Sequence, residues 1–207
     1  MRTAPLSTHQ RRHAVALVAG ALLILLASLL DRQLIAPFYD AALRDFPLRR
    51  SWAFEVLGHT ALKWLMLGFW LLCLAWGGRL RRGALYMAVI AAVVAALKHY
   101  SPISCPWDLP EYGGARPDAG RCLPAAHPLT GFALFGLVLA LSERPRAARY
   151  ALSAALLIGV MAGAVQVARG AHFPSHVLWT AWSAWAVTLA LAVGQGWLRL
   201  RRSADRQ

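Results

Sequence analysis

The fold is decided by residues 149–198, which read RYALSAALLIGVMAGAVQVA, then RGAHFPS, then HVLWTAWSAWAVTLALAVGQGWL. The first and third parts are largely apolar and match the ~20 residues that a helix needs to cross the hydrocarbon core of a bilayer. The short part between them holds a glycine and a proline, which is typical of a turn. The stretch therefore predicts two membrane-spanning helices, at 149–168 and 176–198, that meet at a polar corner.

Four further apolar segments precede this pair, at 14–30, 57–76, 84–97 and 128–141. Hydrophobic residues make up 58% of the 207-residue chain, more than in an ordinary soluble domain. If the two shorter segments were soluble core helices, the four longer ones would have nothing to bury against. The sequence predicts an all-α polytopic membrane protein, a bundle of about six transmembrane helices in a single domain, 1–207. The first segment is interpreted as a retained helix, because it lacks a small-x-small cleavage site.

The charges predict how the bundle sits in its membrane. The net charge of +13 comes from short basic clusters between apolar runs, as at membrane borders, and no nucleic-acid partner is expected. Both tails and the loops near 79–82 and 143–149 are basic, whereas the loops at 31–55 and 101–126 are neutral or slightly acidic. By the positive-inside rule, a multi-pass protein of the bacterial inner membrane is expected, with both termini cytoplasmic and residues 169–175 periplasmic.

Ionisable residues gather at the predicted periplasmic face. They are His59, Lys63, Lys98, His99, His127, Arg169, His172 and His176. Ionisable groups at membrane depth are costly and usually functional. Each lysine alone is explained by snorkelling to the interface, but the convergence of the whole set favours a site.

Two helix starts at this face suggest what the site binds. Pro128 and Pro174 stand at predicted first helical positions, and both helices run inward from the same face. Their positive ends and free N–H groups suit an anion, phosphate above all. Lys98, Arg121 and Arg169 add positive charge. The sequence therefore predicts a phosphate site.

Three blocks now suggest a family. Lys98 is followed after six residues by Cys105-Pro106, residues 124–127 read Pro-Ala-Ala-His, and residues 170–176 read Gly-Ala-His-Phe-Pro-Ser-His. In order and spacing these blocks resemble the Lys-x6-Arg-Pro, Pro-Ser-Gly-His and His-x3-Asp motifs of the type 2 phosphatidic acid phosphatase family of membrane lipid phosphatases. The resemblance covers 98–176 and marks a divergent branch.

The departures from the family pattern concern its phosphate ligands. Cys105 and Gln166 stand where the family has arginines, and His176 stands where it has aspartate; the serine and glycine of the second motif are alanines. Arg121, Arg169 and Asp108 are the candidates to substitute.

The resemblance implies a mechanism without metal or cofactor. His172 is the nucleophile and forms a phosphohistidine, and His127 is the general acid. Phosphoryl oxygens are bound by Lys98, Arg121 and Arg169, with Gln166 at a family ligand position. His176 orients the nucleophile.

The implied substrate is a lipid phosphate or diphosphate in the bilayer. An isoprenoid carrier, a phosphatidate and a lipid A phosphate all fit, and the oligomeric state stays open.

Cys105 and Cys122 lie in a loop that the topology places in an oxidising compartment, where disulfides persist. A bridge would stabilise by roughly 3 kcal/mol and would carry Arg121 toward the place of the missing family arginine. The alternative is two unpaired thiols. Cys73 lies in an apolar run and is interpreted as packing.

Two other functions remain open at this point. Metal or haem binding is suggested by His172 and His176, four residues apart, although Pro174 between them argues against a continuous helix. The lost arginines also fit a catalytically inactive relative that acts as a binding or structural membrane protein.

Overall fold

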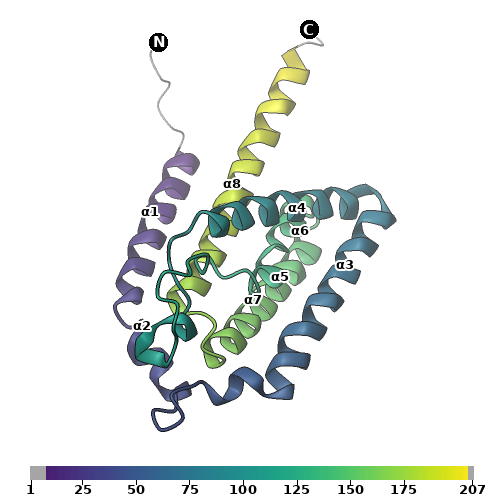
Figure 1. Cartoon of the computed structure of the whole chain (residues 1–207). Helices are drawn as coiled ribbons and strands as arrows, with labels where there is room; N and C mark the ends of the chain where they lie inside the picture. Colours follow the sequence, from purple (N-terminus) through teal and green to yellow (C-terminus); the bar gives the residue numbers. More distant parts are fainter. Residues whose placement is uncertain (1–7, 205–207) are drawn as a thin grey trace.

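A computed structural model describes the backbone of residues 8–204 and the side chains of residues 11–196. Within that range the chain is helical and contains no β-strand (Figure 1). The helices are α1 Thr8–Ser28, α2 Asp31–Ile35, α3 Leu62–Trp76, α4 Gly78–His99, α5 Leu129–Phe132, α6 Phe135–Ala140, α7 Pro145–Ala168 and α8 Pro174–Ala204. A π-helix, Ala53–Ala61, runs directly into α3, and short 3-10 turns form at Ala36–Phe38, Pro47–Arg50, Pro106–Asp108 and Pro110–Tyr112.

Among the residues that the structure describes, five helical stretches are long and apolar enough to cross a membrane. They are Arg11–Ser28, Ala53–Trp76, Gly78–His99, Pro145–Ala168 and Pro174–Gly196. The predicted all-α polytopic fold is confirmed, and the protein is a multi-pass membrane protein.

The segment predicted at 128–141 is shorter than a full span and is broken. Leu129–Ala140 reaches only ~18 Å at ~1.5 Å per residue, against a hydrocarbon core of ~30 Å. Hydrogen bonds from Leu134 to Gly131 and from Gly136 to Ala133 span three residues and tighten the chain between α5 and α6. Most residues of this segment are buried and none is exposed, so it forms the centre of the bundle.

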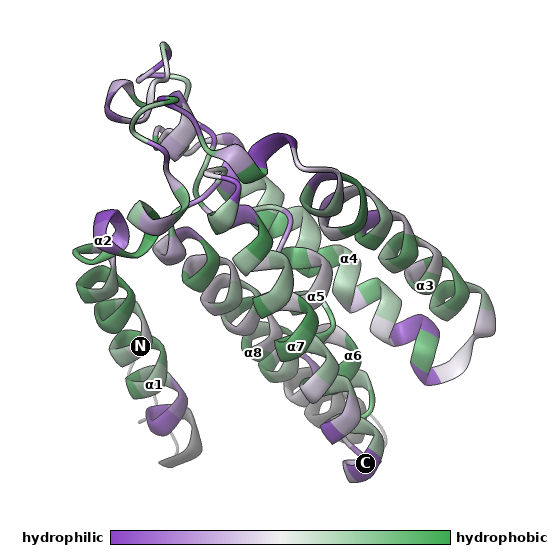
Figure 2. Ribbon diagram, turned by 90° about the horizontal axis from the view of Figure 1, so that it is seen from below, coloured by the Kyte–Doolittle hydropathy of each residue, from purple (hydrophilic) through white to green (hydrophobic). Residues whose placement is uncertain are grey.

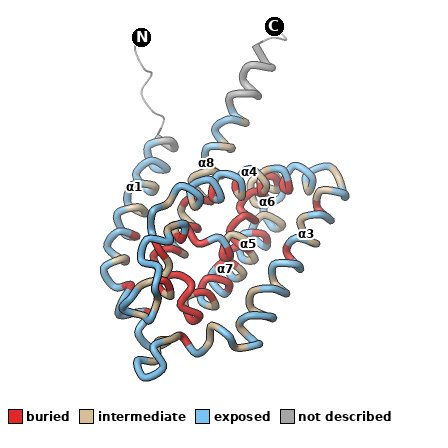
Figure 3. The backbone as a smooth tube through the Cα atoms, in the orientation of Figure 1, coloured by how far each residue is buried: buried red, intermediate tan, exposed pale blue. Residues whose placement is uncertain are grey.

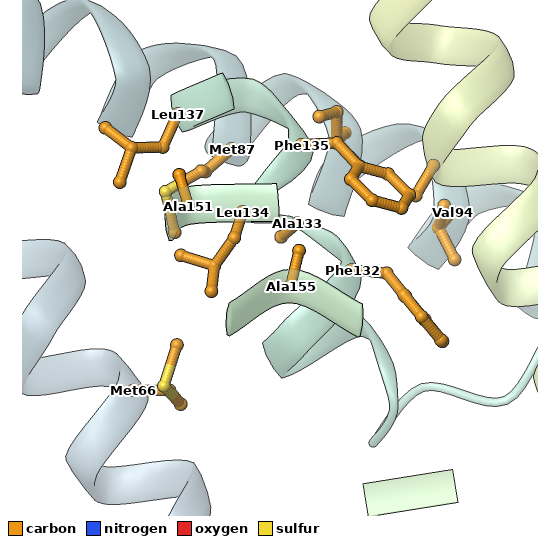
Figure 4. Close-up of a cluster of buried hydrophobic side chains, with 12 residues drawn as sticks. Met66, Met87, Val94, Phe132, Ala133, Leu134, Phe135, Leu137, Ala151 and Ala155 are labelled. Carbon is orange, nitrogen blue, oxygen red and sulfur yellow. The ribbon is translucent and has the colours of Figure 1, made fainter. Parts of the chain in front are cut away.

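The core forms around this central segment (Figure 4). Phe132 and Phe135 pack there with apolar side chains of α4 and with small residues of α7, among them Ala151 and Ala155. Close packing requires the small residues: a Cβ on Gly159 would lie 2.5 Å from the Phe132 ring. Small residues at such interfaces let membrane helices approach closely.

The outer helices face away from this core. In Figure 3, α1 and α3 are largely exposed, whereas the end of α7 and the start of α8 are largely buried. Exposed side chains on α1 include Val15, Leu22 and Leu26, and apolar side chains of this kind suit contact with lipid tails. One hydrogen bond, from Trp182 Nε1 to the carbonyl of Leu17, ties α1 to α8.

The two ends of the bundle differ in character. At one end α1 begins, α8 ends (Figure 1) and Arg79 of α4 pairs with Glu143. The opposite end carries α2 and the segments at 29–52, 100–128 and 169–173, which contact one another through pairs such as Arg32–Glu111 and Trp107–Gly170. Figure 2 shows hydrophilic loops gathered at this end, near α2. We call this opposite end the site end.

Candidate functional site

His172 lies in a corner between α7 and α8. Gly170, with φ +70°, ends α7, and hydrogen bonds from Ala171 N to Gln166 O and from Gly170 N to Val167 O form a Schellman cap. Pro174 then starts α8, as the sequence predicted. We call residues 166–176 the α7–α8 corner. The cap fixes the backbone before His172, and the start of α8 fixes it afterwards. The place of His172 is therefore set by the ends of the two helices.

Three of the predicted site residues act electrostatically on His172. Its side chain is buried, and burial lowers its pKa well below the usual value. The nearby charges of His176, Lys98 and His127 lower the pKa further, whereas a backbone interaction with Cys122 opposes them. His172 is therefore neutral at neutral pH, the state in which an imidazole nitrogen can act as a nucleophile.

His127 occupies the other side of the site. Its Nε2 lies 3.0 Å from the carbonyl oxygen of Gly58, and its ring lies 4.4 Å from that of His59. A carbonyl oxygen only accepts, so this nitrogen carries the proton. Burial lowers the pKa of His127 to about 4. The ring is thus held in a defined tautomer with Nδ1 as its available acceptor.

Lys98 and Arg121 meet at a cavity of about 230 Å³, which is also lined by Ala126 and Leu129. The Nζ atom of Lys98, at the end of α4, donates to the carbonyl oxygen of Arg121 at 2.5 Å. Arg121 has φ +56°, an uncommon value for a residue other than glycine. The two predicted phosphate ligands therefore border the same space.

Cys105 and Cys122 form a disulfide with a Cα–Cα distance of 5.1 Å. Two backbone hydrogen bonds flank it, from Arg121 N to Ser101 O and from Cys122 N to Ile103 O. The bridge and these bonds close the loop over the α7–α8 corner, where Trp107 N donates to Gly170 O.

Two predicted substitutes for the missing family residues are engaged elsewhere. Arg169 is buried, and its guanidinium donates to Glu55 at 2.8 Å and to the carbonyl of Arg49 at 3.3 Å. Asp108 pairs with Arg116 at 2.9 Å. Arg169 thus connects the corner to the segment that holds Arg49 and Glu55. Asp108 stabilises the loop that contains both it and Arg116.

Gln166 and His176 occupy positions at which the family has charged residues. Both are buried, and Gln166 Nε2 and His176 Nδ1 lack a hydrogen-bond partner within the described part of the chain. The rings of His172 and His176 are 5.7 Å apart, edge to face. No hydrogen bond between these rings is seen among the described residues, so the expected orienting bond from His176 is not formed.

The expectation of free N–H groups at two helix starts is wrong. Ser175, in the first turn of α8, donates its backbone N–H to Asp31 at 2.9 Å, and its hydroxyl also donates to that carboxylate. At the other start, Leu129 N and Thr130 N donate to Ala126 O and His127 O. The N–H groups are therefore occupied by the protein itself.

Asp31 is a residue that the sequence reasoning missed. It is buried, burial raises its pKa, and the hydrogen bonds from Ser175 act in the opposite direction. It caps α8 through Ser175, which lies 144 residues later in the chain, and no local pattern signals such a pairing.

Fold and site together define a multi-pass membrane protein with buried histidines and a half-buried lysine at one end. The family model described as PAP2 superfamily matches residues 79–199, more than half of the chain. The chain belongs to the PAP2 superfamily, as the motifs indicated, and members of this superfamily are phosphatases. No curated protein and no solved structure gives a significant match to the chain.

Proposed function

We propose that this protein is a lipid phosphatase that hydrolyses a phosphomonoester or diphosphate of a membrane lipid through a phosphohistidine on His172. The observation that carries the proposal is a buried His172 in the α7–α8 corner whose ring lies 5.7 Å from that of His176. Burial and the nearby Lys98 and His127 lower the pKa of His172, so its ring is neutral. Membership of the PAP2 superfamily supports the class of reaction.

In the proposed reaction, Nε2 of His172 attacks phosphorus, and the bond from phosphorus to the lipid oxygen breaks. His127 gives that oxygen a proton and later takes one from the water that attacks phosphorus. In this second step the bond from phosphorus to Nε2 of His172 breaks, which frees the histidine and releases inorganic phosphate. In the free site, burial and, to a smaller extent, the nearby charges of His59, Arg169 and Lys63 hold the pKa of His127 at about 4. The negative charge of a bound phosphate raises this pKa and lets His127 carry the proton.

The phosphoryl oxygens are bound in this scheme by Lys98, Arg121 and Gln166. Lys98 and Arg121 border one cavity, and the buried Nε2 of Gln166 lacks an acceptor among the described residues. A phosphoryl oxygen supplies one, and fixed donors of this kind stabilise charge that develops in the transition state. Arg169, bound by Glu55, contributes charge beside His127 rather than a direct contact.

An apolar groove supports a lipid as the substrate. It has a volume of about 440 Å³ and lies between α3, α4 and α5. Its lining includes Lys63, Met66, Trp70, Met87, Ala91 and Thr130. Ala126 and Leu129 line both this groove and the Lys98 cavity, so a lipid chain in the groove places its head group at Lys98.

The membrane orientation is part of the proposal. Both tails of the sequence are basic, as are the short loops at the end where α1 begins and α8 ends, whereas the long loops at the site end are not. The positive-inside rule then puts the site in the periplasm of a bacterial inner membrane. Reporter fusions at the C-terminus that show a periplasmic location contradict this orientation.

The test is phosphate release by the purified protein in lipid nanodiscs with a chelator present, using phosphatidate, an isoprenyl diphosphate and a lipid A phosphate. We expect turnover of at least one lipid and a labelled phosphoenzyme, both abolished by His172→Asn. His13→Asn, on α1 and far from the corner, is the matched control and keeps full activity. Loss of activity on chelation identifies a metalloenzyme, and a folded protein without turnover of any of the three lipids is an inactive relative.

A further inference from the structure

The sulfur of Cys122 lies directly against the ring of His172. The distance from Sγ to Nδ1 is 3.1 Å, and Cys122 is fully buried. The same sulfur lies 3.3 Å from the carbonyl oxygen of Ala171, so it sits in the α7–α8 corner. Because Cys122 is bonded to Cys105, its sulfur has no hydrogen and acts only as an acceptor. The contact is therefore an Nδ1–H···S hydrogen bond.

At the site end, the carboxylates that are buried or that bind the corner already have hydrogen-bond or ion-pair partners. Asp31 accepts from Ser175, Asp108 pairs with Arg116, and Glu55 pairs with Arg169. His176, at the position where the family resemblance implies an aspartate, lies edge to face with the His172 ring. Among the described residues, the disulfide sulfur is thus the side-chain atom placed to accept a proton from Nδ1.

We propose that the disulfide sulfur of Cys122 is the positioning group for His172, holding the proton on Nδ1 and leaving Nε2 unprotonated for attack. The inference rests on the proposed function and names a group that the family motifs do not contain. A sulfur is neutral, so it fixes the tautomer without drawing a positive charge onto the ring. A nucleophilic histidine needs its other nitrogen held in this way.

Reduction of the disulfide should reverse the tautomer of His172. When a dithiol reductant gives two electrons and two hydrogens to the bridge, two thiols form and the reductant closes into its own disulfide. The Cys122 sulfur then carries a hydrogen and can donate to Nδ1, which shifts the ring proton to Nε2. The nucleophilic lone pair is lost although the side chains stay in place.

The direct test is the tautomer of His172, read by nitrogen NMR of protein labelled with 15N-histidine in micelles, with His172→Gln assigning the signal. We expect the Nδ1–H form in the oxidised protein and its loss in Cys105→Ala, which leaves a thiol at position 122. An Nε2–H form in the oxidised protein overturns the proposal. So does an unchanged Nδ1–H form in Cys105→Ala, because the backbone of Cys122 would then suffice.

A chemical rescue separates the role of the Cys122 sulfur as a hydrogen-bond acceptor from the role of its covalent link to Cys105. Methyl methanethiosulfonate converts the Cys122 thiol of Cys105→Ala into a methyl disulfide and releases methanesulfinate, which restores a sulfur without hydrogen but not the link to residue 105. Cys73→Ala is the background, and Cys105→Ala with Cys122→Ala is the matched control. We expect Cys105→Ala to lower kcat roughly 10–100-fold with KM little changed. The reagent should restore both kcat and the Nδ1–H tautomer in Cys105→Ala, but not in the control that also lacks Cys122.

The tautomer is measured without turnover, so the two proposals fail separately. An inactive wild-type protein that shows the expected tautomer change refutes the phosphatase and keeps the positioning role. An active protein with the Nε2–H form refutes the positioning role alone. Mass spectrometry establishes whether Cys122 carries the methyl disulfide. If the modified Cys105→Ala variant recovers neither kcat nor the Nδ1–H tautomer, the positioning role is also refuted.

Discussion

The α7–α8 corner and the apolar groove differ in how tightly they are built. In the corner every residue from Ala168 to His172 is buried, and a Schellman cap, a disulfide loop and the ion pair of Arg169 hold it. The groove is bordered by exposed residues such as Leu67 and opens between helices. The difference separates two tasks: reacting groups need a fixed geometry, whereas a lipid chain needs an entrance from the bilayer.

Among changes that compare the two regions, the largest effect is expected from exchanging the lysine of each region for methionine. Lys98→Met removes the charge beside His172 and should lower kcat roughly 10²–10³-fold, as the loss of a transition-state donor does. Lys63→Met, in the groove, should change kcat little. Phosphate release in nanodiscs measures both, and melting curves check that both variants fold. Equal losses in the two variants would remove the distinction between the regions.

The comparison also explains what the sequence could and could not predict. Apolar runs and the Gly-x-His-x-Pro corner predict helices and the place of His172, because these depend on neighbouring residues. Arg169 lies three residues from His172, yet its guanidinium binds Glu55. Asp31 and Ser175 pair across 144 residues, and the Cys122–His172 contact requires the loop to fold over the corner. Such pairings depend on tertiary packing, which one sequence does not reveal.

Glycine-to-alanine changes probe the tightness of the two regions directly. Gly170 has φ +70°, and a Cβ there would lie 2.2 Å from the Phe46 ring. Gly170→Ala should therefore lower the unfolding free energy by more than about 2 kcal/mol, from backbone strain and the clash together. Gly68, on α3, has nothing within 4 Å, so Gly68→Ala should be neutral or stabilising by up to about 1 kcal/mol. Thermal unfolding in detergent measures both; a tolerant Gly170→Ala would mean that the corner is not rigid.

Acid should destabilise the fold around the site through His127, whose pKa is about 4 in the folded protein against about 6.5 in the unfolded chain. Between these values the unfolded chain binds more protons, so stability is complete above pH ~6.5 and is lost as the pH falls toward 4. The loss amounts to roughly 3 kcal/mol. Reversible denaturation from pH 7 to pH 4 should be flatter for His127→Gln than for the wild type, and parallel curves would contradict the assignment.

The smallest effect is expected in the groove. Ala91 lines it, whereas the next residue along α4, Ala92, is exposed on the outside of the bundle. Ala91→Phe fills part of the groove, so the lipid chain loses apolar contact worth about 1 kcal/mol. KM for a long-chain lipid phosphate should therefore rise several-fold. A short-chain substrate should be unaffected, and Ala92→Phe should change neither KM. Because the groove binds the lipid chain and the corner performs the reaction, kcat should stay near the wild-type value in both variants. A fall in kcat with unchanged KM in Ala91→Phe would show instead that the groove supports the geometry of the corner.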